Sequence, residues 1–159
     1  MAMVTTAATG AEQIEAVFRE DGDRLWRALV TFGGDPDLAS DAVAEAFAQA
    51  LRRASELRDP QAWVWKVSFR LAAAELKRRS STVRAVPDAG YVDPELDAEL
   101  HEALTRLPTR QRVCVVLFYY LDAPIGEIAR RTGMSNLSVR VNLSRGRARL
   151  RQLLGDRDD

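Results

Sequence analysis

PIGEIARRTGMSNLSVRVNLSRGRARLRQLL, residues 124–154, contains two helix-forming segments separated by a short turn. The first segment ends at Gly133, a residue type that readily adopts the positive φ of a helix C-terminus. Ser135 precedes the second segment and can cap it by accepting a hydrogen bond from a backbone N–H that lacks a helical partner. A short helix, a turn and a second helix are typical of a helix-turn-helix, which binds DNA.

The second helix, predicted over residues 135–154, has an apolar face and a basic face when drawn at about 100° per residue. The apolar side, expected to pack on the preceding helices, contains Val139, Leu143, Leu150 and Leu154. The opposite side contains Ser138, Asn142, Arg145 and Arg149, and a row between the two contains Arg140, Arg147 and Arg151. No acidic residue occurs in this helix, which favours contact with phosphates over the alternative of a merely solvated basic helix.

Exposed side chains near the start of this helix are expected to lie deepest in a major groove. They are Leu137, Ser138, Val141, Asn142 and Arg145. Apolar side chains can contact thymine methyl groups, while Asn can pair with adenine and Arg with guanine. The helix therefore carries the residue types needed to distinguish bases.

The composition is that of a globular protein. The chain has 159 residues, of which 47% are hydrophobic and 29% charged, enough for one ordinary domain or two small ones. Its net charge is zero, but acidic residues gather near residues 35–45 and 88–102 and basic ones near 66–84 and 140–151. Because a binding partner experiences the local charge, this neutrality does not exclude nucleic-acid binding.

We expect no catalysis, metal or cofactor. Cys114 is the only cysteine and lies in an apolar run, so it is interpreted as a reduced core residue rather than a nucleophile. His101 is the only histidine, and the chain has no zinc-ligand spacing and no Gly-rich phosphate loop. The acidic series Asp93, Glu95, Asp97, Glu99 and Glu102 is interpreted as a solvated helix face rather than a metal site. Without a long apolar run or a secretion signal, the protein is expected to be cytoplasmic, with no membrane insertion.

Asp-Pro pairs at residues 35–36, 59–60 and 93–94 each precede a helical pattern, with Asp as cap and Pro at the first helical position. Helices are predicted over residues 12–32, 36–55, 60–79, 94–106, 108–121, 124–132 and 135–154. The predicted fold class is therefore all-α, with two small helical bundles, residues 12–79 and 94–154, joined by a linker at residues 80–93. The C-terminal bundle contains the helix-turn-helix.

The first two helices each show an apolar stripe that predicts a core. The first stripe is Ile14, Phe18, Leu25, Leu29 and Phe32, and the second is Val43, Phe47, Ala50, Leu51 and Ala54. An outer ridge on the second helix remains, made of Asp41, Glu45, Ala48, Gln49 and Arg52. From the pattern alone, this ridge is interpreted as plain surface rather than as a docking site.

The third helix is apolar around more than half of its circumference, which predicts burial between neighbours. Its inward residues are Val64, Trp65, Val67, Phe69, Leu71, Ala72, Ala74 and Leu76. One basic strip remains, consisting of Lys66, Arg70 and Lys77, with Trp63 at its leading edge. An aromatic ring beside cations suits single-stranded nucleic acid, since bases stack on the ring while cations follow the backbone. A core position for Trp63 is an equal alternative.

Four segments, in this order, resemble a known family. They are DAVAEAF (41–47), AWVWKV (62–67), LPTRQRV (107–113) and LSRGRARL (143–150). Together they resemble the extracytoplasmic-function (ECF) group of RNA polymerase sigma factors, which hold two conserved helical regions called region 2 and region 4. The resemblance covers nearly the whole chain.

The resemblance implies a transcription-initiation function with core RNA polymerase and promoter DNA as partners, and it leaves room for an anti-sigma factor. It implies that the clamp helices of the β′ subunit bind the outer ridge of the second helix, made of Asp41, Glu45, Ala48, Gln49 and Arg52. This implication reverses the interpretation of the ridge as plain surface. The β flap of the polymerase would be a further contact. The segment 54–59 with Trp63, Lys66, Arg70 and Lys77 would bind the downstream promoter element. Region 4 would bind the upstream element through Ser138, Val141, Asn142 and Arg145, with Arg140, Arg147 and Arg149 on phosphates.

Several positions depart from the family pattern. Ala44 replaces a usual Gln, and Phe69-Arg70 occupies the place of a usual Arg-Asn pair. Leu137 and Asn142 replace a small and a basic residue in the recognition helix. Promoter choice is therefore expected to differ from the common pattern.

Two other functions remain open at this point, a stand-alone helix-turn-helix regulator and a sigma-derived adaptor that does not bind DNA. We also hypothesise that the acidic helix start near residues 93–102 folds against the arginines of the last helix and masks DNA binding in the free protein.

Overall fold

The computed structural model describes residues 9–81 and 98–155, and these residues are helical without any strand. The N-terminal bundle contains α1 (Gly10–Gly33), α2 (Pro36–Arg52), the short 3-10 helix η1 (Ala54–Glu56) and α3 (Pro60–Ser81). The C-terminal bundle contains α4 (Ala98–Thr105), α5 (Thr109–Val115), the π-helical segment η2 (Val116–Tyr120), α6 (Ile125–Thr132) and α7 (Asn136–Leu154). The predicted all-α class is confirmed, and the residues predicted to begin the fourth helix, 94–97, lie outside the described residues.

Local capping explains where several helices begin and end. The carboxylate of Asp35 accepts hydrogen bonds from the backbone N–H groups of Asp37 and Leu38, at 2.8 and 3.3 Å. The Asp59 carboxylate accepts one from Ala62 at 3.1 Å, whereas Asp93 lies outside the described residues. These side chains satisfy N–H groups that have no partner within the helix, as the Asp-Pro pattern predicted.

The helix predicted over residues 108–121 has two parts. Its second half, η2, has the wider π-helical hydrogen bonding, and the N–H of Ala123 returns to the carbonyl of Leu117 at 3.2 Å. Asp122 follows with φ 53°, a left-handed conformation that Asp tolerates better than most residues. The chain can therefore turn sharply into α6.

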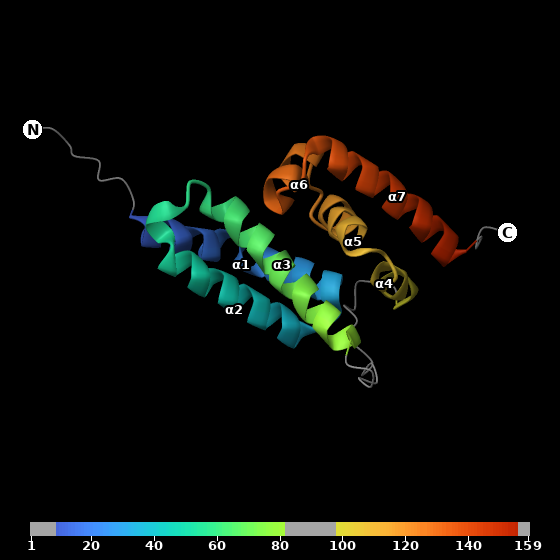
Figure 1. The fold of residues 1–159 in the computed structure, drawn as a ribbon, viewed down its shortest axis with the longest axis horizontal. Coiled ribbons are helices and arrows are strands. Elements are labelled where there is room, and N and C mark those ends of the chain that lie inside the picture. Colours follow the sequence, from blue (N-terminus) through green and yellow to red (C-terminus); the bar gives the residue numbers. More distant parts are fainter. Residues whose placement is uncertain (1–8, 82–97, 156–159) are drawn as a thin grey trace, which may run out of the picture.

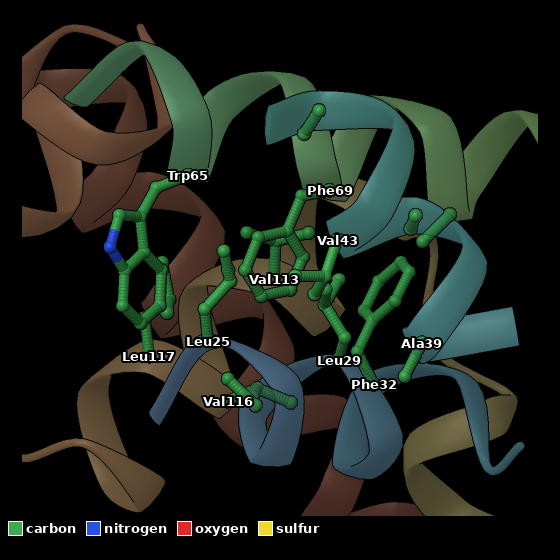
Figure 2. Packing of buried hydrophobic residues seen from close by; sticks show 14 of the residues in the cluster. Leu25, Leu29, Phe32, Ala39, Val43, Trp65, Phe69, Val113, Val116 and Leu117 are labelled. Atoms are coloured by element: carbon green, nitrogen blue, oxygen red, sulfur yellow. The ribbon is translucent and has the colours of Figure 1, made fainter. Parts of the chain in front are cut away.

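The two bundles share one hydrophobic core. Figure 2 shows Trp65 and Phe69 of α3 close to Leu117 and Val113 of the C-terminal bundle, with Leu25 and Leu29 of α1 alongside. Trp65, Leu25 and Leu117 are fully buried, and each such side chain contributes roughly 1.5–3 kcal/mol. In Figure 1, α6 lies beside α3, and the contacts between these two helices join the bundles. The sequence predicted two bundles and a linker, but it did not predict this packing of one bundle on the other.

Three residues expected in the core lie at the surface. Phe18 is 56% exposed and Leu51 is 53% exposed, and Ala74 is also exposed. The Phe18 ring packs edge-on against Phe47, with centroids 5.1 Å apart. The physical reason is that a helix buries only the part of its apolar stripe that faces a neighbour, so these residues remain at the rim of the bundle.

Candidate nucleic-acid interface

The helix-turn-helix forms as its sequence predicts. Gly133 ends α6 with φ 76°, and its N–H donates to the carbonyl of Ala129 at 2.9 Å. The Ser135 hydroxyl accepts a hydrogen bond from the N–H of Ser138 at 3.1 Å and so caps α7. These two contacts set the turn between α6 and α7.

Helix α7 packs on α5 through its apolar face and leaves the basic face outside. Val139 and Leu143 are buried, and so is Gly146. A β-carbon at Gly146 would lie 2.7 Å from Cγ2 of Val115, so glycine permits the close approach of the two helices. The opposite side, with Arg140, Arg145 and Arg149, is exposed.

The apolar and polar residues predicted to contact bases have different environments. Leu137 is 71% exposed and Val141 36%, and because they are four residues apart on α7 they lie side by side, where both can contact a partner. Ser138 and Asn142 are half-buried. The Asn142 amide donates to the carbonyl of Ser138 at 2.8 Å, within its own helix. The Asn142 amide is therefore partly engaged within α7.

Arg147 lies apart from the other arginines of α7. Its Cζ lies 4.8 Å from the centroid of the Phe118 ring and 5.3 Å from that of Tyr119, both in η2. This half-buried guanidinium stacks on aromatic rings and supports the packing of α7. Its predicted contact with phosphate stays a prediction.

A basic hollow lies between the start of α5 and the middle of α7. It has a volume of about 380 Å³ and is lined by Arg106, Pro108, Gln111, Arg145, Ala148, Arg149 and Gln152. Arg106 is paired with Glu102 at 3.0 Å, whereas Arg145 and Arg149 are exposed. The two α7 arginines therefore extend the basic face toward the end of α4.

The basic strip on α3 is only partly open to solvent. Trp63 is half-buried and packs against the core, a position between the two alternatives that its sequence allowed. Lys66 is half-buried, and Arg70 and Lys77 are exposed. Lys66 and Arg70 line a cavity between the bundles, so this half of the strip faces the C-terminal bundle.

A cluster of polar residues joins the two bundles beside this strip. We call it the bridging cluster, and its members are Asp21, Asp59, Gln61, Trp65, Glu127, Arg130 and Arg131. Arg130 of α6 donates to the Asp59 carboxylate at 2.5 Å and to the Gln61 side-chain oxygen at 2.7 Å. Burial raises the pKa of Asp59, but its hydrogen bonds with Arg130 and with the N–H of Ala62 outweigh this effect, so that the pKa is lowered overall. The hydrogen bond from Arg130 also lowers the pKa of Glu127.

The buried half of the cluster is centred on Asp21. Its Oδ2 accepts hydrogen bonds from Gln61 at 2.7 Å and from the Trp65 indole at 2.9 Å. Arg131 lies over the Trp65 ring and places Nη1 4.0 Å from the same oxygen. No sequence pattern indicates this cluster, because arginines in the last turn of a helix are ordinary and no spacing connects them with α1 or α3.

The outer ridge of α2 lies at the surface. Asp41, Glu45 and Arg52 are exposed, and Ala48 and Gln49 are half-buried. Glu45 accepts a hydrogen bond from the Gln49 amide at 2.9 Å and lies 3.5 Å from Arg52. Such exposed pairs contribute little to stability, so the ridge is available for contact with a partner.

Comparison with known proteins agrees with this architecture. Residues 97–150 match the family described as Sigma-70, region 4. RNA polymerase sigma factor SigV of Bacillus subtilis (strain 168) is 29% identical over 131 residues, which cover 76% of this chain and 78% of that protein. ECF RNA polymerase sigma factor SigM of Mycobacterium tuberculosis (strain ATCC 25618 / H37Rv) is 27% identical over 150 residues, which cover 89% of this chain and 76% of that protein.

Over most of its length the chain is therefore similar to ECF sigma factors, and its C-terminal part matches sigma-70 region 4. Solved structures share the fold of this chain. Sigma factor RpoE from Bartonella quintana, solved with the anti-sigma factor NepR, has a TM-score of 0.66 at 19% identity, covering 91% of this chain and 99% of that one. CnrH, solved with the cytosolic domain of CnrY, has a TM-score of 0.63 at 22% identity, covering 89% and 86%.

The match to region 4 covers most of α4–α7. The predicted division into residues 12–79 and 94–154 and the predicted site residues are not tested by these comparisons, and they stay predictions. Within residues 9–81 and 98–155, no group of three or more His, Cys, Asp or Glu residues could hold a metal ion. Over the same ranges, no helix is both long and apolar enough to cross a membrane. Of the acidic series, Asp93, Glu95 and Asp97 lie outside the described residues, and Glu102 pairs with Arg106.

Proposed function

We propose that this chain is an ECF sigma factor, which binds core RNA polymerase and directs it to promoters for transcription initiation. The observation that carries the proposal is the exposed face of α7, which has only basic charges and belongs to a helix-turn-helix within the segment matching region 4. Phosphate neutralisation along this face supplies affinity, while Val141, Asn142 and Arg145 supply base contacts. The chain is assigned no catalytic step, since RNA synthesis belongs to the polymerase.

The site residues divide into three surfaces in this proposal. The upstream element is bound by Ser138, Arg140, Val141, Asn142, Arg145, Arg147 and Arg149. The downstream element is bound by Trp63, Lys66, Arg70 and Lys77. The ridge Asp41, Glu45, Ala48, Gln49 and Arg52 binds polymerase. Once the chain is held on polymerase and one promoter element is bound, binding of the second element is intramolecular and therefore occurs at a high effective concentration. Two weak DNA contacts then select a promoter together.

The packing of the bundles implies a rearrangement before initiation. Lys66 lies against the turn after α6, since a β-carbon at Gly133 would be 3.1 Å from Cε of Lys66. A DNA strand along Trp63, Lys66 and Arg70 would need the space beside this turn. We therefore infer that α6 leaves α3, with loss of the Arg130 and Arg131 contacts, when the downstream element binds.

Transcription in vitro with core polymerase and a genomic promoter library tests the proposal. The wild-type chain should select a defined set of start sites. Arg145→Ala should weaken or change that selection. Each lost base contact should cost about 1–3 kcal/mol of binding free energy, as one mismatched base pair does. Glu45→Arg should weaken assembly with core polymerase without affecting the affinity of the chain for isolated promoter DNA. The matched control, Glu20→Arg, changes an exposed acid of α1 outside the three surfaces.

The rival functions give different results in the same assays. A stand-alone regulator would bind DNA tightly without polymerase and protect two half-sites. An adaptor that does not bind DNA would assemble with polymerase and tolerate the double change of Arg145 and Arg149 to alanine. Absence of both assembly and start-site selection would overturn the proposal.

A further inference from the structure

The cavity between the bundles is lined by cations from both sides. Its volume is about 400 Å³. Lys66 and Arg70 enter it from α3, one helical turn apart, and Arg110 enters from α5. The hydroxyl-bearing residues Thr109 and Thr132 also line it. The remaining lining residues are Phe69, Ala73, Val113, Gly133 and Met134, which make part of the wall apolar.

Lys66, Arg70 and Arg110 differ from several other arginines of the chain in their lack of an acidic partner among the described residues. Arg79, Arg106, Arg130 and Arg131 each pair with a carboxylate at 4.0 Å or less. Among residues 9–81 and 98–155, no carboxylate pairs with Lys66, Arg70 or Arg110, and none of the three makes a side-chain hydrogen bond. Three positive charges around one cavity repel one another, and the repulsion is strongest where water is partly excluded.

An anion in the cavity would offset this repulsion. Lys and Arg side chains together with hydroxyl groups are typical phosphate ligands, and an arginine can donate two parallel hydrogen bonds to one phosphate. The volume lies in the range of small-molecule sites, about 300–1,000 Å³, and the apolar wall is also typical of such sites. The cavity lies between α3 on one side and α5 with the turn after α6 on the other, and Arg70 and Arg110 are exposed at its opening, so a ligand can reach the cations from solvent.

We propose that this cavity binds a small phosphorylated molecule, either a nucleotide or an inorganic polyphosphate. The phosphate groups contact Lys66 and Arg70 of one bundle and Arg110 of the other. Because the ligand contacts both bundles, it binds the packed arrangement more tightly than the separated one. It therefore holds the packed arrangement and opposes binding of the downstream promoter element. Binding of the ligand rests on the packing of the bundles alone, whereas its effect on the downstream promoter element rests on the proposed function.

Isothermal titration calorimetry of the full chain, without DNA or polymerase, tests the site. The two probes are ATP and inorganic tripolyphosphate, each titrated at constant ionic strength and without divalent cations. We expect saturable binding of one probe molecule per chain. Arg110→Gln should weaken it about tenfold or more, the equivalent of one charge-assisted hydrogen bond. Arg24→Gln, which removes an exposed cation of α1 outside the cavity, is the matched control and should bind like the wild type.

The two probes distinguish the sources of the phosphate. Tighter binding of ATP assigns a nucleotide whose base contacts the apolar wall, and equal binding assigns the phosphate groups alone. Lys66→Gln is a second variant, which keeps the test valid if Arg110→Gln fails to fold by circular dichroism. Absence of saturable binding of both probes, or equal weakening by the cavity variants and the Arg24→Gln control, would overturn the proposal. The calorimetry contains neither DNA nor polymerase, so its outcome is independent of the transcription assay and the two proposals can fail separately.

Discussion

The guanidinium of Arg131 lies over the indole ring of Trp65, with Cζ 4.4 Å from the ring centroid. This contact joins α6 of the helix-turn-helix to α3 of the N-terminal bundle. Arg131 is 9% exposed and also donates from Nε to Glu127 at 3.2 Å. A cation over an aromatic ring is most favourable where water is excluded, so this pair is a main link between the bundles.

Replacing Arg131 should separate the bundles. Arg131→Met removes the cation over Trp65 and leaves Asp21 without its nearby positive charge, although Asp21 keeps its bonds to Gln61 and Trp65. We expect the free energy of unfolding to fall by about 2–4 kcal/mol. Urea denaturation measures the loss, and small-angle X-ray scattering should record a larger radius of gyration. The control is Arg151→Met, an exposed arginine at the end of α7. An equal loss in both variants would contradict the role of Arg131.

The pair of Arg130 and Asp59 should make a smaller contribution. Their side chains are 33% and 48% exposed, so solvent screens the attraction. A double-mutant cycle with Arg130→Gln and Asp59→Asn should give a coupling energy of about 0.5–1 kcal/mol. Because the pKa of Asp59 is lowered in the folded chain, its stabilisation is present above the ordinary pKa of 3.8 and is lost as pH falls through the folded value. Asp59→Asn should therefore weaken the acid dependence of unfolding below about pH 4.

The close packing of α7 on α5 predicts opposite results for two glycine substitutions. Gly146→Ala should cost about 1–3 kcal/mol, because its β-carbon would lie 2.7 Å from Val115. Gly126→Ala, in α6, meets no atom within 4 Å and should be neutral or stabilising by up to about 1 kcal/mol. Thermal unfolding of both variants checks the difference. Similar melting temperatures for the two variants would show that α7 can move away from Val115 without cost.

The buried thiol of Cys114 should report opening of the C-terminal bundle. Burial raises its pKa to about 11, so little thiolate exists at neutral pH. We expect labelling by a thiol reagent at pH 8 to be slow in the native chain and fast in denaturant. Cys114 in the Arg131→Met variant should react faster with the reagent than in the wild type only if separation of the bundles also exposes α5. Rapid labelling of the native wild type would contradict the burial of Cys114.

His101 should make stability depend on pH near neutrality. Its ring lies against Gly34, where a β-carbon would be 2.6 Å from Nε2. Burial, and then the charge of Arg112, lower its pKa below the ordinary value of 6.5. The unfolded chain therefore binds the proton more readily, so stability is full above about pH 6.5 and decreases as pH falls toward the lower folded pKa. Unfolding measured from pH 7.5 to 5.5 should show a smaller decrease in His101→Gln than in the wild type.

Helix positions and the helix-turn-helix could be predicted from sequence because their causes are local. Asp35 and Ser135 cap helices through N–H groups two or three residues away, and Gly133 ends α6 through its own φ. The faces of α7 follow from its period, so the buried Val139 and the exposed Arg145 were predicted together. Phe18 and Leu51 were misplaced, because the period shows which residues share a face but not how far a neighbour covers it.

Only the tertiary structure reveals that the two bundles pack on each other. Arg130 meets Asp59 across 71 residues and Gln61 across 69. The same packing brings Arg110 to the cavity that Lys66 and Arg70 line. Such contacts have no periodic signal in the chain, because their geometry is set by the relative placement of whole helices. Local rules determine the helices and their caps, whereas burial of a common core decides which polar side chains meet between them.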